Sequence, residues 1–202
     1  MRIFITGGCK NGKSTLARRL ALSQRTDDGL FYIATMIPNG EEDEARVARH
    51  QAERSGDGFT TIERPRNIAD LLRIIPAETE FSTHSNSSSP PARMAGETRF
   101  HRASLLLDST TALLQNEMFR YGELDCDAQL RVAAQLLQVL DAAENVVVVS
   151  DFIFSDAMLY SKETELYRRG LAAVDRVVAG RCEAVVEVAY SGLILHKGEL
   201  TL

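Results

Sequence analysis

The chain has 202 residues, of which 45% are hydrophobic, and it carries a formal net charge of −5 at pH 7. This length and apolar content suffice for one sizeable buried core, and we expect residues 1–202 to form a single domain. The acidic balance argues against a nucleic-acid-binding protein, whose contact surface would be basic. The sequence contains no apolar run of about 18 residues and no secretory signal, so we expect no membrane span and a cytoplasmic location.

The chain opens with an apolar, β-branched run at residues 2–6, which leads directly into Gly-Gly-Cys-Lys-Asn-Gly-Lys-Ser. This is the phosphate-binding loop (P-loop) pattern, in which backbone N–H groups and the positive end of the next helix surround nucleotide phosphates. Leucines at helical spacing follow, an order that a simple glycine-rich surface turn would lack. We expect Lys13 to contact the β- and γ-phosphates and Ser14 to bind Mg²⁺. The nucleotide-binding residues predicted here are Gly7, Gly8, Cys9, Lys10, Asn11, Gly12, Lys13, Ser14 and Thr15.

Further along the chain, apolar runs typical of buried parallel strands alternate with stretches of helical periodicity. The strands are expected at 30–34, 104–107, 145–149, 184–188 and 193–195, and the helices at 68–75, 110–121, 128–143 and 163–179. This alternation predicts an α/β fold with a doubly wound, mostly parallel sheet flanked by helices, of the P-loop (RecA-like) type. Residues 82–101 are rich in Ser and Pro with little apolar content, which predicts a flexible insertion at 82–103.

A helix is also expected over residues 41–54, and residues four apart on it share one face. Glu42, Arg46, His50 and Arg54 form one such stripe. Two flanking arginines favour a phosphate near His50 and oppose protonation of its ring, which keeps a nitrogen lone pair available for attack on phosphorus. A solvated helix carrying Glu–Arg pairs is the alternative interpretation.

Several motifs, taken in order and rough spacing, resemble the adenosylcobinamide kinase/adenosylcobinamide-phosphate guanylyltransferase family of cobalamin biosynthesis. They are the P-loop, Tyr32-Ile33-Ala34-Thr35, Arg46-Val47-x-x-His50-x-x-x-Arg54, Thr61-Ile62-Glu63-x-Pro65, Leu106-Leu107-Asp108-Ser109-Thr110-Thr111 with Asn116, and the closing residues 183–193. Members of that family phosphorylate the aminopropanol hydroxyl of adenosylcobinamide. They then transfer GMP from GTP to the product by way of a histidine–GMP intermediate.

The resemblance implies His50 as the catalytic histidine, acting with Lys13 at the P-loop. It also implies that Glu63 and Asp108 contact the guanosine and that Arg54 holds phosphates. Asp108 further corresponds to the carboxylate that directs the metal in P-loop enzymes, so Ser14 and Asp108 are the expected Mg²⁺ ligands. The additional nucleotide-binding residues that the resemblance implies are Ile33, Ala34, Thr35, Gln51, Arg54, Glu63 and Asp108.

The chain departs from the family pattern after the strand at 145–149. The family carries an acidic residue and glycines there, whereas this chain reads Ser-Asp-Phe-Ile-Phe-Ser-Asp-Ala over 150–157. Asp151 and Asp156 are the candidates to replace the missing acid, although an acid in such a loop is often only a turn former. The kinase step depends on whether one of them reaches the γ-phosphate.

The predicted function is therefore that of a bifunctional kinase and guanylyltransferase, an enzyme that uses ATP and GTP with Mg²⁺ and forms adenosylcobinamide-GDP. The expected partners are a corrinoid substrate and a nucleoside triphosphate, in a possible homotrimer. Two alternatives stay open: a P-loop kinase of small molecules without guanylyl transfer, and a non-catalytic GTP-binding regulatory protein.

Overall fold

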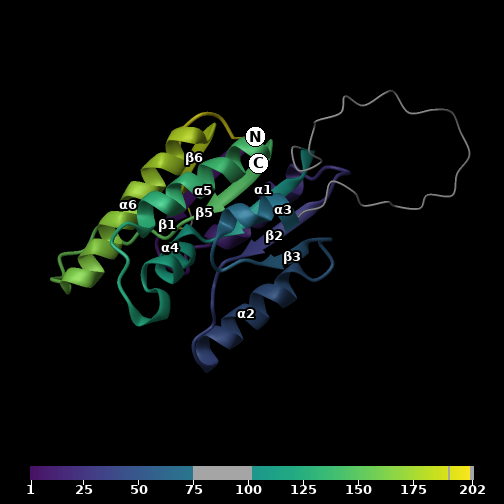
Figure 1. Cartoon of the computed structure of the whole chain (residues 1–202). Helices are drawn as coiled ribbons and strands as arrows, with labels where there is room; N and C mark the ends of the chain where they lie inside the picture. Colours follow the sequence, from purple (N-terminus) through teal and green to yellow (C-terminus); the bar gives the residue numbers. More distant parts are fainter. Residues whose placement is uncertain (75–101, 191, 201–202) are drawn as a thin grey trace, which may run out of the picture.

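A computed structural model describes residues 1–74, 102–190 and 192–200, which form a seven-stranded sheet in the order β3-β2-β4-β5-β1-β6-β7 (Figure 1). The strands are β1 (Arg2–Gly7), β2 (Leu30–Ala34), β3 (Thr60–Glu63), β4 (Ser104–Asp108), β5 (Asn145–Val149), β6 (Ala184–Ala189) and β7 (Gly192–Lys197). The helices are α1 (Lys13–Ser23), α2 (Glu41–Arg54), α3 (Leu71–Ile74), α4 (Thr110–Met118), α5 (Ala128–Ala142) and α6 (Lys162–Arg181), with 3-10 turns at Ile68–Asp70 and Arg120–Gly122. No helix within these residues is long and apolar enough to cross a membrane.

The strand that precedes the P-loop lies in the interior of the sheet. β1 pairs in parallel with β5 on one side and with β6 on the other, so that Ile3 lies opposite both Val147 and Ala184. Only β7, at the edge beside β6, runs antiparallel among the paired strands of the described chain. The carboxyl ends of the parallel strands therefore meet at one edge, where ligands bind in open α/β sheets.

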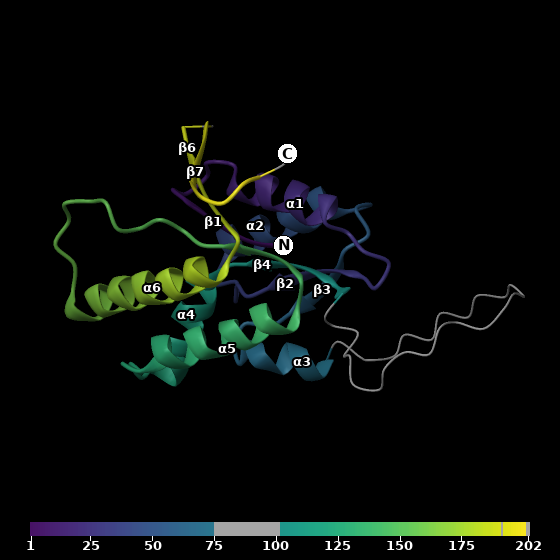
Figure 2. The same cartoon turned by 90° about the horizontal axis from the view of Figure 1, so that it is seen from above.

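Helices cover both faces of this sheet, as parallel strands with apolar residues on both faces require. Phe4 belongs to a core formed with α4, α5 and α6, whereas Ile3 and Ile5 pack with Leu16 and Leu20 of α1 on the opposite face. Figure 2 shows α1 on one side of the sheet and α4, α5 and α6 on the other. The predicted doubly wound α/β class is confirmed.

α2 differs from the other long helices because none of its residues is buried. Its first turn consists of four acidic residues, Glu41 to Glu44, and its last turn carries Arg54. Negative charges at the amino end and a positive charge at the carboxyl end interact favourably with the helix dipole. These interactions stabilise α2, to which burial contributes little. In Figure 1, α2 stands apart from the main body, below β2 and β3.

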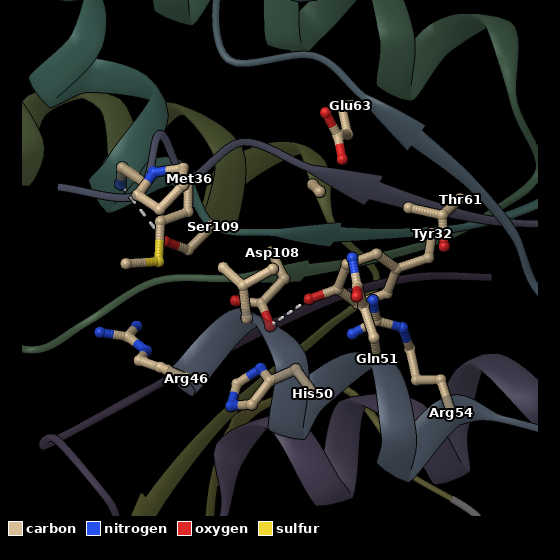
Figure 3. A pocket seen from close by; sticks show the side chains of 14 residues that line it. Tyr32, Met36, Arg46, His50, Gln51, Arg54, Thr61, Glu63, Asp108 and Ser109 are labelled. Carbon is tan, nitrogen blue, oxygen red and sulfur yellow. Dashed lines mark hydrogen bonds between the residues drawn. The ribbon is translucent and has the colours of Figure 1, made fainter. Parts of the chain in front are cut away.

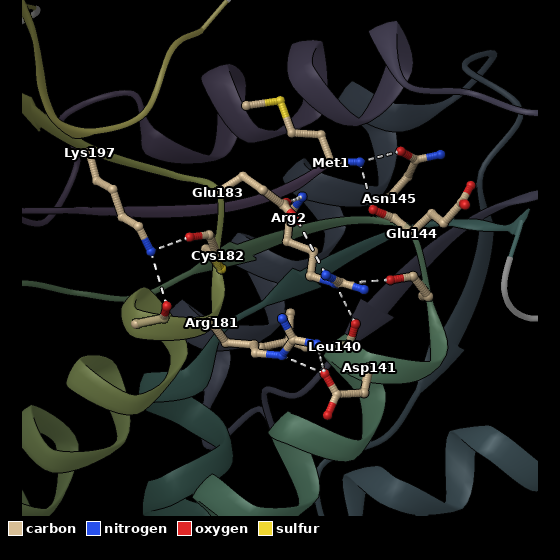
Figure 4. Close-up of polar contacts among 12 residues, drawn as sticks. Met1, Arg2, Leu140, Asp141, Glu144, Asn145, Arg181, Cys182, Glu183 and Lys197 are labelled. Atoms are coloured by element: carbon tan, nitrogen blue, oxygen red, sulfur yellow. Dashed lines mark hydrogen bonds and ion pairs between the residues drawn. The ribbon is translucent and has the colours of Figure 1, made fainter.

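The amino end of β1 is anchored on the side away from the P-loop (Figure 4). The amino group of Met1 donates to the Glu144 carbonyl oxygen at 2.6 Å and to Asn145 Oδ1 at 2.7 Å. Arg2 Nε donates to the carbonyl oxygens of Leu140 at 2.5 Å and Ala143 at 3.2 Å, at the carboxyl end of α5. The P-loop strand is thus fixed at its start as well as along its length.

The expected strands at 30–34 and 145–149 agree with β2 and β5, and the other three are one to three residues longer than expected. The sequence interpretation missed β3, which is short and mostly exposed, so that its residues show no apolar run. The expected helix at 68–75 is a 3-10 turn followed by one turn of α-helix, and the helix at 110–121 ends at Met118. The predicted insertion at 82–103 lies outside the described residues except for residues 102 and 103.

Candidate functional site

The P-loop connects β1 to α1 in a conformation that requires glycine at both ends. Gly7 has φ 148°, and a Cβ there would lie 2.3 Å from the Val188 carbonyl oxygen of the neighbouring strand. Gly12, directly before α1, has φ 95°, a backbone angle that residues other than glycine adopt rarely. The Asn11 side chain donates to that same Val188 oxygen and accepts from the Lys13 backbone N–H at 3.3 Å, which fixes the loop against β6.

Lys13 turns its ammonium group back over this loop. Its side chain is only 6% exposed, and Nζ donates to the Gly8 carbonyl oxygen at 2.5 Å. Nζ also lies 3.0 Å from Asp151 Oδ1, at the carboxyl end of β5. Of the two acidic residues proposed for the 150–157 segment, the structure brings Asp151 to the P-loop. Asp156 instead accepts from the Tyr160 hydroxyl at 2.7 Å and lies 3.6 Å from Arg168.

Asp108 lies at the carboxyl end of β4 and connects α1 with β2. Its Oδ2 accepts from the Tyr32 hydroxyl at 2.9 Å and lies 3.5 Å from the Ser14 hydroxyl. Burial, followed by the negative charge of Asp108, raises the pKa of Tyr32 above its usual range, so the phenol stays a hydrogen-bond donor. The predicted Mg²⁺ ligands Ser14 and Asp108 are therefore neighbours.

The donor chemistry of this pair fits Mg²⁺. A hydroxyl and a carboxylate are hard oxygen ligands, and Mg²⁺ in nucleotide sites takes one or two protein oxygens together with phosphates and water. The described residues hold no cluster of three His, Cys, Asp or Glu side chains, the arrangement expected of a site made by protein alone.

A cavity of about 150 Å³ lies between α2 and the carboxyl ends of β2, β3 and β4 (Figure 3). It is lined by Tyr32, Ala34, Met36, Pro38, Arg46, Val47, His50, Gln51, Arg54, Thr61, Glu63, Asp108, Ser109 and Ala112. A smaller space of about 20 Å³ lies between α1 and α2, and Ser14, His50 and Asp108 all border it. His50 and Asp108 thus face both the larger cavity and the P-loop helix.

His50 has a lowered pKa, as the stripe of arginines predicts, but the causes rank differently. Burial is the largest cause, the negative charges of Asp108 and Glu53 act against it, and Arg46 and Arg54 lower the pKa by less. The neutral ring is the form that can act as a nucleophile. The face of α2 that carries Arg46, His50 and Arg54 therefore forms one wall of the cavity.

Arg54 is held against an aromatic ring. Its guanidinium carbon lies 3.4 Å from the centroid of the Tyr32 ring, and the Phe59 ring meets Tyr32 edge-on with centroids 6.2 Å apart. Nearby, Asp57 pairs with Arg18 of α1 through both carboxylate oxygens, including one bond of 2.9 Å to NH2. These contacts connect the carboxyl end of α2 to β2 and to the P-loop helix.

Not every predicted residue borders the cavity. Ile33 is buried in the core, and Thr35 is fully buried, with its hydroxyl donating to the Ser109 carbonyl oxygen and accepting from the Ser109 N–H, both at 2.7 Å. Of the predicted 33–35 stretch, only Ala34 lines the cavity. Cys9 and Lys10 are exposed on the loop, while Gln51 and Glu63 line the cavity.

Sequence reasoning missed a buried polar cluster beneath the site. Asp175 of α6 accepts from the Ser150 hydroxyl at 2.9 Å and from the Thr110 hydroxyl at 3.3 Å. Burial raises its pKa to about 7, against the opposing effect of the two hydroxyl groups, and the nearby charge of Asp151 raises it further. An aspartate inside an otherwise apolar helix face is the signal in the sequence that could have found this cluster.

The fold and the loop geometry define a P-loop nucleotide-binding protein of the α/β class. The fold is similar to that of a solved ATPase domain of G40P, with a TM-score of 0.51 and 10% identity over 98% of this chain and 76% of that domain. At this identity the likeness concerns the fold alone.

Two sequence comparisons find similarity to one enzyme family. Residues 3–82 match the family model described as cobinamide kinase / cobinamide phosphate guanyltransferase. The bifunctional adenosylcobalamin biosynthesis protein CobP of Pseudomonas aeruginosa is 34% identical over 108 residues, which are 48% of this chain and 60% of that relative. These matches show that the chain is similar to this family, as the motifs predicted, and the family model covers the P-loop and His50 and ends before β4.

Proposed function

We propose that this protein is a bifunctional adenosylcobinamide kinase and adenosylcobinamide-phosphate guanylyltransferase that works through a histidine–GMP intermediate. The observation that carries the proposal is the position of His50, which borders both the larger cavity and the space beside Ser14 on the P-loop helix. If a nucleotide binds with its phosphates on the P-loop and its base in the larger cavity, the part between them would lie beside His50. The family matches and the lowered pKa of His50 support the same function.

In the guanylyl transfer, the unprotonated ring nitrogen of His50 attacks the α-phosphorus of GTP. The nitrogen–phosphorus bond forms while the bond between the α-phosphorus and its bridging oxygen breaks, and pyrophosphate leaves with the electron pair. Lys13 and the loop N–H groups stabilise the charge on pyrophosphate, and Mg²⁺ held by Ser14 and Asp108 would supply further neutralisation. A phosphate oxygen of the acceptor then attacks the same phosphorus, which releases His50 and yields adenosylcobinamide-GDP.

The larger cavity supplies a means of choosing GTP over ATP. Glu63 lines it from the end of β3 and can accept hydrogen bonds from the N1 and N2 donors of guanine, which adenine lacks. Arg54, stacked on Tyr32, presents a cation to the same cavity for a phosphate or for the ribose side. We therefore propose that guanylyl transfer is specific for GTP.

Intact-protein mass spectrometry after incubation with GTP and Mg²⁺ tests this proposal. We expect the mass to rise by one GMP through a bond that is labile to acid and stable to alkali, as a phosphoramidate is. His50→Asn should bind GTP and stay unmodified. His196→Asn is the matched control, because His196 lies on the edge strand β7, where it pairs with Glu187 at 2.8 Å.

The absence of any adduct on the unmutated protein, under conditions where GTP binding is measured, would refute the guanylyl transfer. Phosphorylation of the corrinoid alcohol without an adduct would then identify a plain P-loop kinase. The observation behind this second candidate is the contact between Lys13 and Asp151. Both residues lie at the P-loop, where phosphoryl transfer takes place, and the contact does not involve His50.

A further inference from the structure

Asp151 occupies a fixed position at the carboxyl end of β5, next to the P-loop. Its backbone N–H donates to the Thr111 hydroxyl at 2.8 Å, and the N–H of the next residue, Phe152, donates to the Gly7 carbonyl oxygen at 2.9 Å. The chain therefore continues along β1 for three residues beyond β5 and binds to the first residue of the loop. This backbone path directs the Asp151 carboxylate at Lys13, 3.0 Å from its ammonium nitrogen.

The negative charge of Asp151 lies where the phosphates of a bound nucleotide are expected. A P-loop lysine contacts the β- and γ-phosphates, so a carboxylate that touches its ammonium group lies beside the γ-phosphate once a nucleotide is bound. The Lys13 ammonium group, in contact with both anions, reduces the repulsion between the carboxylate and the γ-phosphate. The Asp151 side chain is 30% exposed, so a hydroxyl group from solution can reach it. A carboxylate in that place suits an alcohol that approaches the γ-phosphorus.

We propose that Asp151 is the general base of the phosphoryl transfer, an inference that rests on the kinase half of the proposed function. The acceptor hydroxyl gives its proton to the Asp151 carboxylate while its oxygen forms a bond to the γ-phosphorus. The bond between the γ-phosphorus and the bridging oxygen breaks, and the nucleoside diphosphate leaves with the electron pair. The proton then passes from Asp151 to water through the exposed part of its side chain.

Contacts elsewhere in the described chain separate Asp151 from the other acids near the loop. Asp108 already accepts hydrogen bonds from Tyr32 and Ser14 on the α1 side of the loop. Asp175 is buried behind Ser150 and Thr110. Asp151 therefore combines exposure to solution with contact to Lys13.

The test compares Asp151→Asn with the matched control Asp156→Asn, which removes an acid of the same segment that does not reach the loop. Phosphoryl transfer from ATP or GTP to adenosylcobinamide gives kcat, and calorimetry gives the nucleotide Kd. Asp151→Asn should lower kcat by about 100-fold or more, the range for a general base. Its nucleotide Kd should be equal or lower because Lys13 loses a competing partner, and its GMP adduct should still form. Asp156→Asn should match the unmutated protein, and Asp151→Glu should restore part of kcat.

Two outcomes would overturn the inference while leaving the guanylyl transfer intact. One is a kcat for Asp151→Asn within a few-fold of the unmutated value, which would make Asp151 only a partner of Lys13 in the empty loop. The other is a loss of kcat matched by an equal loss of nucleotide affinity. If the unmutated protein binds nucleotide but phosphorylates no alcohol, the kinase half of the proposed function fails, and the inference fails with it.

Discussion

Replacement of the buried Asp175 by Asn should change how the stability of this protein depends on pH. The carboxyl group is 8% exposed, and its two oxygens accept hydrogen bonds from Ser150 and Thr110. The single Asn oxygen can keep one of these bonds, and the Asn NH2 can donate to the other hydroxyl. The difference is that Asn does not ionise. Asp151 and two arginines of α6, Arg169 and Arg176, are the charged neighbours, the arginines lining the same cleft as Asp175.

The magnitude follows from the pKa of Asp175, which burial raises from its ordinary value of 3.8 to about 7. Between these two pH values the folded protein binds more protons at this group than the unfolded chain does, so the unfolding free energy falls as pH rises. The pKa difference between 3.8 and about 7 corresponds to a loss of about 4 kcal/mol in the unfolding free energy. This loss is absent below pH 3.8 and complete above about pH 7.

Urea denaturation of both proteins at several pH values between 4 and 8.5 measures this effect. The unfolding free energy of Asp175→Asn relative to the unmutated protein should increase by up to about 4 kcal/mol across this range. Asp27→Asn, at an exposed acid, should show a constant difference near zero. A difference for Asp175→Asn that stays constant with pH would refute the reasoning, because it would mean that the carboxyl group ionises equally easily in both states.

Two further predictions concern the site. Lys13→Ala should weaken GTP binding by roughly 30-fold, since a lost charge-assisted contact is worth about 2 kcal/mol, and unchanged affinity in calorimetry would contradict the role of the loop. Tyr32→Phe should lower the unfolding free energy by about 1.5 kcal/mol, because it removes a hydrogen bond of 2.9 Å to the Asp108 carboxylate. Chemical denaturation at pH 7 measures this loss, and a Phe variant as stable as the unmutated protein would show that the bond has no net value.

The elements that the sequence predicted well are those with a strong local pattern. The buried valines of β5 and the P-loop between β1 and α1 follow directly from apolar runs and glycine spacing. β3 has three exposed residues out of four and is held by its pairing with β2, and that pairing across distant residues leaves no local pattern. Its existence could not be predicted from periodicity.

The candidate site was predictable only as a set of separate motifs. The stripe on α2 indicated Arg46, His50 and Arg54, and the structure brings all three to one cavity. The contact between Lys13 and Asp151 joins residues that are distant in the sequence, because β1 and β5 are neighbours in the sheet. Sequence alone left Asp151 and Asp156 as equal candidates, since the path of the chain after β5 is what separates them.

The two halves of the site rest on parts of the fold with different local stability. β1 has a hydrogen-bonded strand on each side and a buried core on each face, so we expect its amide protons to exchange with solvent only when the whole sheet unfolds. α2 buries none of its side chains, so we expect its amides to exchange through small local openings that leave the sheet intact. The histidine would then lie on a helix that opens and closes many times while the strand before the phosphate-binding loop stays in place.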